Sequence, residues 1–248
     1  MLSKSQISFV NALHVKKNRK DLSLFLVEGV KSISEFLNSA FIVESIYCSS
    51  ATLIKFSKLS PTVKFYEITD AELKKISTLT TPQDAVAIIR IPEKTPLRPE
   101  SFKDRFTIIL DGIQDPGNMG TIIRTADWFG FSEIICSEDT VEVYNPKVVQ
   151  ASMGSLSRVA VHYTDLSQLV SNSGIPVYGT LLAGVSIYET SFTEPGFIVL
   201  GNEGKGISYA VIPLITNQIT IPRFGNAESL NVAISAAIVC SEIKRRGI

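Results

Sequence analysis

The sequence has few of the residues that build disulfide frameworks, metal sites or histidine triads. Its three cysteines, Cys48, Cys136 and Cys240, are far apart, and this spacing fits neither a disulfide framework nor a pair of zinc ligands. The two histidines, His14 and His162, lie far from any cysteine or serine motif. We therefore expect three buried thiols in a reducing compartment, two ordinary histidines that are partly buried or at the surface, and no metal.

The sequence also lacks an excess of one charge and a long apolar run. Its 24 basic and 24 acidic residues cancel, so any contact with nucleic acid has to come from local patches. The first ten residues contain no signal-peptide apolar region, and no apolar run approaches the roughly 20 residues that cross a bilayer. We expect a cytoplasmic protein without membrane contact. The hydrophobic share of 45% can form the core of one large or two modest globular domains.

Residues 92–104 predict a linker between two domains. This stretch contains three prolines within eight positions and several charges, between apolar runs. Before it, short apolar runs alternate with amphipathic segments and predict a small α/β domain over residues 1–91. The predicted strands are LFLVEG, VESIYCSS and DAVAIIRIP, and the predicted helices are KSISEFLNS and DAELKKIS.

Residues 105–248 predict a mostly parallel sheet with helices on both faces. Near-continuous apolar runs suit strands that are buried on both sides, and helical segments separate them. The runs are FTIILDG, SEIICSE, IPVYGTLLA, GFIVLGNEG and NQITIPRFG. Ligands of such sheets bind at the loops that follow the carboxyl ends of the strands. Three of these loops contain polar residues and glycines: DGIQDPGNMG, GNEGKGIS and PRFGNAESLN.

The first loop predicts a turn followed by a helix. Pro116 and Gly117 suit the two central positions of a type II turn, and Asn118 stands at the mouth of the helix. The helix is expected to end at Gly130.

Arg124 lies on this predicted helix, on a different face from the apolar residues. Helical side chains lean toward the N-terminus, so Arg124 reaches back over Gly120 toward Asn118 and the turn. The alternative is a solvated arginine that pairs with Asp127 or Glu133.

The second loop, residues 201–208, holds Glu203 between glycines. It matches neither a phosphate-binding loop nor a dinucleotide-binding loop, and a carboxylate there suits a cation or a hydroxyl better than a phosphate. The alternative is a purely structural role, as a tight turn with a solvated ion pair. The residues that follow, SYAVIPLI, predict a helix.

The third loop leads into a long helix that starts near Ser229. Ser229 suits the N-cap of that helix, and this structural role is the alternative to a functional one. Asn231, two residues later, is harder to explain as a cap. The alanine-rich helix suggests close packing against another element or another subunit.

The segments NMGTIIRTADWFG, IVLGNEGKGIS and IPRFGNAESLNVAISAAIVCSE, taken together, strongly resemble the three motifs of the SpoU family of RNA ribose 2′-O-methyltransferases, within the SPOUT superfamily. The resemblance runs from about Phe106 to the C-terminus. Gln150 stands where the family often has arginine, and Arg223 where it often has methionine. Residues 1 to about 90 resemble, less specifically, an L30e-like RNA-binding domain, chiefly through LFLVEGVKSISEFL.

The resemblance implies a C-terminal trefoil knot, S-adenosylmethionine as cofactor and a homodimer with active sites near the subunit interface. Unaided, the pattern predicts only an ordinary doubly wound sheet, because knots are rare. The positions that match the family's functional polar residues are Asn118, Arg124, Glu203, Ser229 and Asn231. Those that match its cofactor loops are Leu181, Gly201, Asn202, Gly206, Ile221 and Leu230.

Methyl transfer to a ribose hydroxyl needs alignment and loss of a weakly acidic proton, but no metal and no covalent enzyme intermediate. A guanidinium keeps its proton in proteins, so we expect Arg124 to hold a phosphate or stabilise the developing alkoxide rather than act as a base. The densest basic run supplies Lys16, Lys17 and Arg19 as candidate RNA contacts. Such runs are also often solvated faces.

The substrate is expected to be ribosomal RNA rather than transfer RNA, because the two-domain layout resembles the ribosomal members of the family more closely. A transfer RNA methyltransferase and a non-catalytic RNA-binding protein on the same scaffold are the alternatives. A Rossmann-type oxidoreductase is disfavoured because no glycine fingerprint follows the first strand of the second domain.

Overall fold

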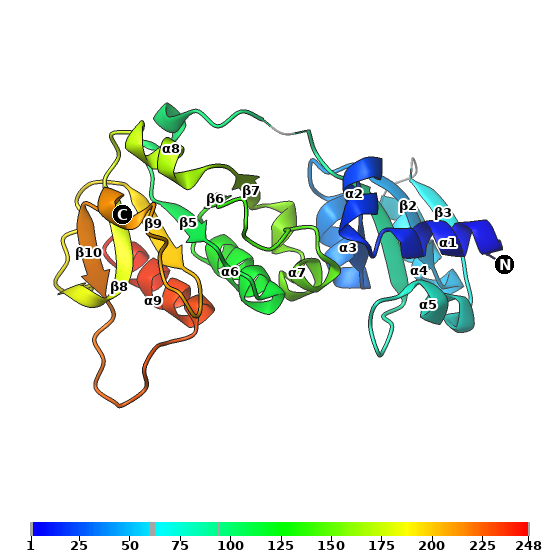
Figure 1. The fold of residues 1–248 in the computed structure, drawn as a ribbon. Coiled ribbons are helices and arrows are strands. Elements are labelled where there is room, and N and C mark those ends of the chain that lie inside the picture. The colour runs from blue at the N-terminus through cyan, green and yellow to red at the C-terminus, as the bar shows by residue number, and fades with distance from the viewer. Residues whose placement is uncertain (1, 60–62, 94, 248) are drawn as a thin grey trace. The chain divides into compact units, whose positions relative to one another are not determined.

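The computed structural model describes residues 2–59, 63–93 and 95–247, and the chain folds into two compact units (Figure 1). The N-terminal unit comprises residues 1–93 together with residues 142–158, and the C-terminal unit comprises residues 94–141 and 159–248. A short segment from the second half of the chain therefore belongs to the N-terminal unit.

The N-terminal unit is built on a four-stranded sheet in the order β1-β4-β2-β3. Strand β4 runs antiparallel to both β1 and β2, whereas β2 and β3 are parallel. The strands are β1 (Leu24–Glu28), β2 (Val43–Cys48), β3 (Lys64–Glu67) and β4 (Ala85–Arg90). The helices are α1 (Lys4–Ala12), α2 (Lys16–Leu22), α3 (Val30–Leu37), α4 (Ser50–Leu59), α5 (Asp70–Ile76) and α7 (Pro146–Ala151), with a 3₁₀ turn η2 (Ser155–Ser157).

Residues 142–158 join this unit through an aromatic cluster in its core. The ring of Tyr144 packs 4.7 Å from that of Phe25, centroid to centroid, and Phe25 also contacts Phe36 and Phe41 edge to face. Burial raises the pKa of Tyr144 to about 12. Aromatic pairs of this kind add stabilisation beyond the apolar area they bury, so Tyr144 anchors the segment to the unit.

The C-terminal unit is an α/β fold around a six-stranded parallel sheet in the order β10-β8-β9-β5-β6-β7 (Figure 1). The strands are β5 (Thr107–Asp111), β6 (Glu133–Cys136), β7 (Ala160–Tyr163), β8 (Val177–Ser186), β9 (Phe197–Gly201) and β10 (Asn217–Thr220). The helices are α6 (Pro116–Trp128), α8 (Leu166–Ser171) and α9 (Val232–Arg245), with 3₁₀ turns η1 (Pro99–Phe102) and η3 (Ile212–Leu214). The predicted parallel sheet is confirmed.

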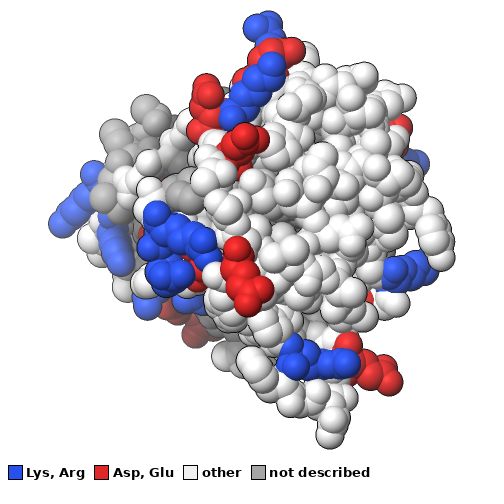
Figure 2. Space-filling view, turned by 90° about the vertical axis from the view of Figure 1, so that its left-hand side faces the viewer, with Lys and Arg blue, Asp and Glu red and all other residues white. Residues whose placement is uncertain are grey.

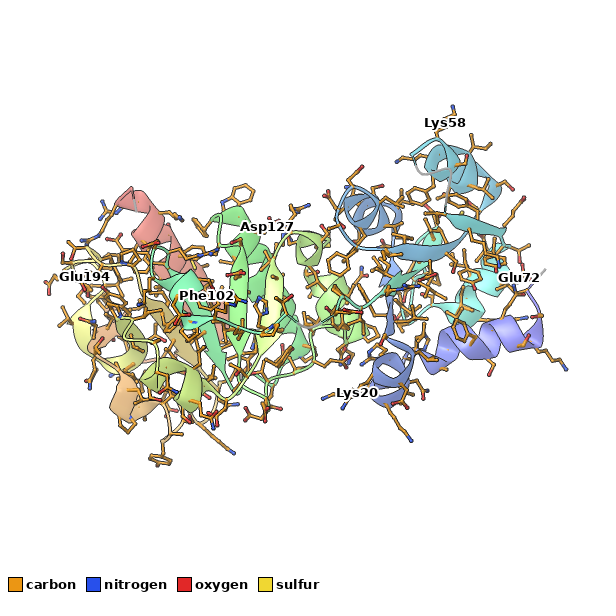
Figure 3. The ribbon with its side chains drawn as sticks, turned by 90° about the horizontal axis from the view of Figure 1, so that it is seen from above. Lys20, Lys58, Glu72, Phe102, Asp127 and Glu194 are labelled. Carbon is orange, nitrogen blue, oxygen red and sulfur yellow. The ribbon has the colours of Figure 1, made fainter. Side chains whose placement is uncertain are left out.

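The central strands β5 and β9 are buried along almost their whole length, as their continuous apolar runs predict. Phe102 lies in the stretch predicted to be a linker, and its side chain points into the core beside Phe197, where it is buried (Figure 3). The short edge strand β7 has no continuous apolar run, and for that reason the sequence pattern did not reveal it.

Two local predictions in the C-terminal unit are wrong. The stretch DPGN is not a type II turn: Asp115 caps helix α6 by accepting a hydrogen bond from the Asn118 amide, and Pro116 is the first helical residue, where its missing N–H costs nothing. Residues 208–215 form turns and the short η3 instead of an α-helix, because Pro213 has no N–H to continue one. Gly130 follows the end of α6 with a φ of +72°, as predicted.

Candidate active site

The three polar loops all leave one edge of the parallel sheet. They follow β5, β9 and β10, and β8 lies between β9 and β10 in the sheet. In a parallel sheet the carboxyl ends of all strands face the same way, so residues far apart in the sequence meet at this edge. We call it the carboxyl edge.

A row of three hydrogen-bonded side chains joins the loops there. The Asn118 amide nitrogen donates to Glu203 Oε1 at 2.9 Å, and its amide oxygen accepts from Asn231 Nδ2, also at 2.9 Å. The other carboxylate oxygen of Glu203 lies 3.5 Å from the main-chain nitrogen of Gln114. One residue from each loop therefore contributes to a single polar row, and all three were predicted site residues.

The second loop is fastened by its own main chain and by Asn202. Asn202 and Gly206 exchange two main-chain hydrogen bonds of 2.9 Å. The Asn202 side chain accepts from the amides of Gly204 and Lys205 and donates to the carbonyl of Gly112 at 2.7 Å. The Asn202 side chain therefore bonds only to other residues of the protein, and its role is to shape the loop that holds Glu203.

Gly201 has no room for a side chain. A Cβ there would collide with the main chain of Gly206 and Ile207, where the loop closes on itself. This close approach of two backbone segments explains the glycine at the end of β9.

The first loop is held by residues that sequence reasoning missed. The Ser137 hydroxyl accepts from the Gly112 amide at 2.8 Å and donates to Asp139 at 2.6 Å. The buried carboxylate of Asp111 accepts from the Ser208 amide at 2.7 Å and so ties the end of β5 to the end of the second loop. An acid at the end of a buried strand was the available signal, because a buried carboxylate needs a donor.

The third loop ends in a cap that corrects the prediction for Ser229. Asn231 is the N-cap of α9, and its side-chain oxygen accepts from the amides of Ala233 and Ile234. Ser229 and Leu230 lie exposed in the preceding loop. An asparagine has both an acceptor and a donor, which lets Asn231 cap the helix and bond Asn118 at once.

The rest of the third loop is open. Within the described chain, the main chain of residues 222–230 forms no hydrogen bond to another main-chain group. Ile221 is half-buried at the start of this stretch, directly after β10. The unbonded N–H and C=O groups of this loop are thus available to a ligand or to water.

Arg124 is exposed on α6, six residues after Asn118 and so about 9 Å further along the helix axis. Among the residues that the structure describes, none forms a hydrogen bond or ion pair with its guanidinium. The alternative of a helical ion pair with Asp127 or Glu133 is therefore not seen.

Leu181 lies in an irregular part of β8. The pairing with β10 shifts between Gly179 and Val185, so residues 180–184 bulge from the strand. Within the bulge, the Leu181 side chain packs on the core, while the Thr180 hydroxyl donates to the carbonyl of Val199 at 2.8 Å. The bulge thus presents its main chain at the carboxyl edge, beside β9.

The basic run of the N-terminal unit divides into exposed lysines and one buried arginine. Lys16 and Lys17 are exposed on α2. The prediction for Arg19 is wrong: its side chain is only 2% exposed, donates to the carbonyls of Leu13 and His14, and pairs with Glu142 at 2.5 Å. A guanidinium with these partners holds the unit together and is not available to a phosphate.

The three cysteines are buried thiols, as predicted. Burial raises the pKa of Cys48 to about 11 and that of Cys240 to about 12, and it raises the pKa of Cys136 further still. Both histidines are partly buried. Across the described ranges, no three histidine, cysteine or acidic side chains form a metal-binding group, and no helix is long and apolar enough to cross a membrane.

The fold and the site together define an α/β protein that presents a polar row at the carboxyl edge of a parallel sheet. Residues 105–241 match the family model of the SpoU rRNA methylase family, and residues 4–87 match that of the MRM3-like substrate-binding domain. The chain belongs to the SpoU rRNA methylase family.

The whole chain resembles characterised relatives. It is 32% identical to the 23S rRNA (guanosine(2553)-2′-O)-methyltransferase RlmP of Bacillus subtilis, over 94% of this chain and 93% of that protein. A solved structure of a TrmH-family protein from Porphyromonas gingivalis is 42% identical and covers 99% of both chains, with a TM-score of 0.89. The SpoU methyltransferase AviRb of Streptomyces viridochromogenes, solved in complex with S-adenosylmethionine, is 25% identical, with a TM-score of 0.86 over 99% of this chain and 98% of that one.

Proposed function

We propose that this enzyme transfers a methyl group from S-adenosylmethionine to the 2′-hydroxyl of one ribose in the large ribosomal RNA. The observation that carries the proposal is the row Glu203–Asn118–Asn231, which joins all three family motifs at the carboxyl edge. The named relatives that act on 23S rRNA riboses support the choice of RNA and of the 2′-oxygen.

The residues at the carboxyl edge fit S-adenosylmethionine. The open main chain of residues 222–230 offers N–H and C=O groups of the kind that bind an adenine and a methionine group. The proposed cofactor positions lie in the bulge of β8, at the end of β9 or in the loops that follow β9 and β10: Leu181, Gly201, Asn202, Gly206, Ile221 and Leu230. When bound, the cofactor supplies a methyl group that its sulfonium activates.

Arg124 is assigned to the reacting ribose. With the cofactor bound, the 2′-oxygen would bond to the methyl carbon as the carbon–sulfur bond breaks. The bonding electron pair would stay on sulfur, which becomes a neutral thioether, and the hydroxyl proton would pass to water. Negative charge develops on that oxygen, and the Arg124 guanidinium, which bonds no residue that the structure describes, can stabilise it or hold the adjacent phosphate. Asn118, Glu203, Ser229 and Asn231 are assigned to positioning the nucleotide beside Arg124.

A homodimer completes the proposal. Trp128, the last residue of α6, is 84% exposed, and Ile234 in the first turn of the neighbouring α9 is also exposed, so each of the two packed helices presents an apolar side chain to solvent. Such side chains suit a contact with a second copy of the chain. The family's trefoil knot at the C-terminal end is part of the same proposal, and the return of α9 to pack on α6 is compatible with it.

The N-terminal unit is proposed to bind the RNA around its target ribose. The proposal keeps residues 1–91 as the RNA-binding domain, residues 92–104 as the linker and residues 105–248 as the catalytic domain. Lys16 and Lys17 remain candidate phosphate contacts, and Arg19 is removed from that set. The proposal keeps the expected cytoplasmic location, because the enzyme and its RNA have to share a compartment.

The proposal is tested with purified protein, tritiated S-adenosylmethionine and ribosomal RNA from cells that lack the gene. We expect label in the ribose, recovered as a dinucleotide that resists alkali because its 2′-oxygen is blocked. Transfer RNA from the same cells is the comparison that separates the ribosomal from the transfer RNA alternative. Binding of both the cofactor and RNA without any transfer would instead favour a non-catalytic RNA-binding protein.

A further inference from the structure

The loop between β10 and α9 extends away from the body of its unit (Figure 1), and it carries an uncovered aromatic ring. Phe224 is 97% exposed, and Gly225 beside it has open space around it. Single exposed apolar residues are common on protein surfaces, so exposure alone assigns nothing. The assignment of a role to Phe224 depends on its position in the loop and on the residues around it.

Both ends of the loop lie at the proposed active site. It begins directly after Thr220 at the end of β10 and ends at Asn231, which belongs to the polar row with Asn118. The Thr220 hydroxyl donates to the carbonyl of Leu182 at 3.3 Å, and the Leu182 side chain is itself 82% exposed. A second uncovered apolar group therefore lies beside the start of the loop.

Charge does not explain this loop. Arg223 precedes the ring, and one of its nitrogens donates to the carbonyl of Ala227 at 3.2 Å, which braces the tip. Glu228 on the same loop offsets the positive charge of Arg223. The face of the C-terminal unit seen in Figure 2 is also largely uncharged. The feature that distinguishes the tip is its aromatic ring.

We propose that Phe224 is a positioning residue that stacks on a nucleobase of the RNA substrate next to the ribose that is methylated. Every base has a π face, so an exposed aromatic ring holds an unstacked nucleotide without reading its sequence. Stacking at this point would hold the strand in place while Arg124 and the polar row act on the sugar. The inference rests on the proposed function.

The test compares Phe224→Ala with Phe224→Tyr, using ribosomal RNA from cells that lack the gene as the probe. We expect Phe224→Ala to raise KM for this RNA roughly 5- to 100-fold, with KM for S-adenosylmethionine and kcat nearly unchanged. Phe224→Tyr should retain the parental values. The dependence of RNA affinity on salt should keep its slope in Phe224→Ala, because stacking releases no counterions.

Tyr188→Ala is the matched control. Tyr188 is an exposed aromatic residue of the same unit that lies outside the loop, and its carbonyl accepts from Arg246 beyond the far end of α9. This variant should leave KM for RNA unchanged. An equal loss in both variants would overturn the assignment.

Phe224→Trp separates this inference from the proposed function. Trp128 is the single tryptophan of the chain, so the variant adds one fluorophore to a known background. Quenching of the added fluorescence by the ribosomal RNA supports stacking even if the wild type transfers no methyl group. No quenching, a change confined to KM for S-adenosylmethionine, or loss of the dimer in Phe224→Ala would each refute it.

Discussion

The loops that follow β9 and β10 leave the same edge of the sheet, yet their main chains are bonded very differently. In the second loop Asn202 and Gly206 exchange two main-chain hydrogen bonds, and the Asn202 side chain makes three more. Within the described structure, residues 222–230 of the third loop form no hydrogen bond between main-chain groups, and one side-chain bond, from Arg223 to the carbonyl of Ala227, braces the tip. One side of the site is thus prebuilt, and the other has main-chain groups free for ligands.

The difference suggests a division of labour. A fastened loop holds Glu203 and Asn118 in one geometry before any ligand arrives, which lowers the cost of aligning a substrate. An open loop can adapt its N–H and C=O groups to a bound cofactor. Arg124 and Ser229 belong with the open side, because neither has a protein partner in the described chain.

The largest expected effect comes from the open side, at Arg124. Arg124→Ala should lower the rate of methyl transfer roughly 100- to 1000-fold, because it removes a charged donor from the developing alkoxide or its phosphate. The melting temperature should not change, since the side chain is exposed. Single-turnover rates at saturating RNA are the measurement, and a full rate in the variant would remove Arg124 from the chemistry.

On the prebuilt side, Asn118 is the sharpest test. Asn118→Ala should lower the free energy of unfolding by about 0.5–1.5 kcal/mol, since it deprives Glu203 and Asn231 of their shared partner. Asn118→Asp should lower the free energy of unfolding more than Asn118→Ala does, because a carboxylate would then face the Glu203 carboxylate. Denaturant unfolding of both variants gives the answer. Equal stability of Asp and Ala would show that the row does not form in solution.

Hydrogen exchange compares the two loops directly. The amides of Asn202 and Gly206 should exchange slowly in the free protein, because both are hydrogen bonded. Amides of residues 223–230 should exchange fast and become protected when S-adenosylmethionine is added. Protection of the third loop in the free protein would contradict the comparison.

A smaller effect is expected at the exposed surface of α6 and α9. Trp128→Glu should convert the dimer to a monomer, because it puts a charge into the proposed apolar contact. Sedimentation measures the mass, with Phe9→Glu, an exposed aromatic position of α1, as the control. A monomeric wild type would show that the proposed dimer does not form. A dimeric Trp128→Glu would show that the dimer contact lies elsewhere.

The smallest effect concerns a fastened carboxylate outside the site, Glu72 beside the start of the chain (Figure 3). Hydrogen bonds from the amides of Thr69 and Leu2 lower its pKa from 4.5 to about 2. Because the folded pKa is the lower one, the stabilisation is complete above pH 4.5 and is lost as the pH falls toward 2. Glu72→Gln should flatten stability against pH in this window, and an unchanged slope would contradict the assignment.

Sequence reasoning found the parallel sheet because buried parallel strands are continuous apolar runs, as in β5 and β9. It missed β7 and β3, since short edge strands with mixed burial have no such run. The segment SYAVIPLI was predicted as a helix from its apolar content, and Pro213 prevented it.

At the site, residue type alone could not separate caps from ligands. Ser229 was the predicted cap, but asparagine caps a helix as well as serine does, and the chain turns into α9 two residues later, where Asn231 is the N-cap. The partner of Arg19 is Glu142, 123 residues away, so the sequence around Arg19 carried no sign of its burial. Such long-range pairs depend on tertiary structure.

Ribose methylation mapped across the ribosomal RNA of cells with and without the gene tests the central claim most directly. We predict that one 2′-O-methyl group is lost when the gene is deleted, returns with the wild-type gene, and does not return with the gene for Arg124→Ala. Identical methylation in the presence and absence of the gene, or restoration by Arg124→Ala, would contradict the account.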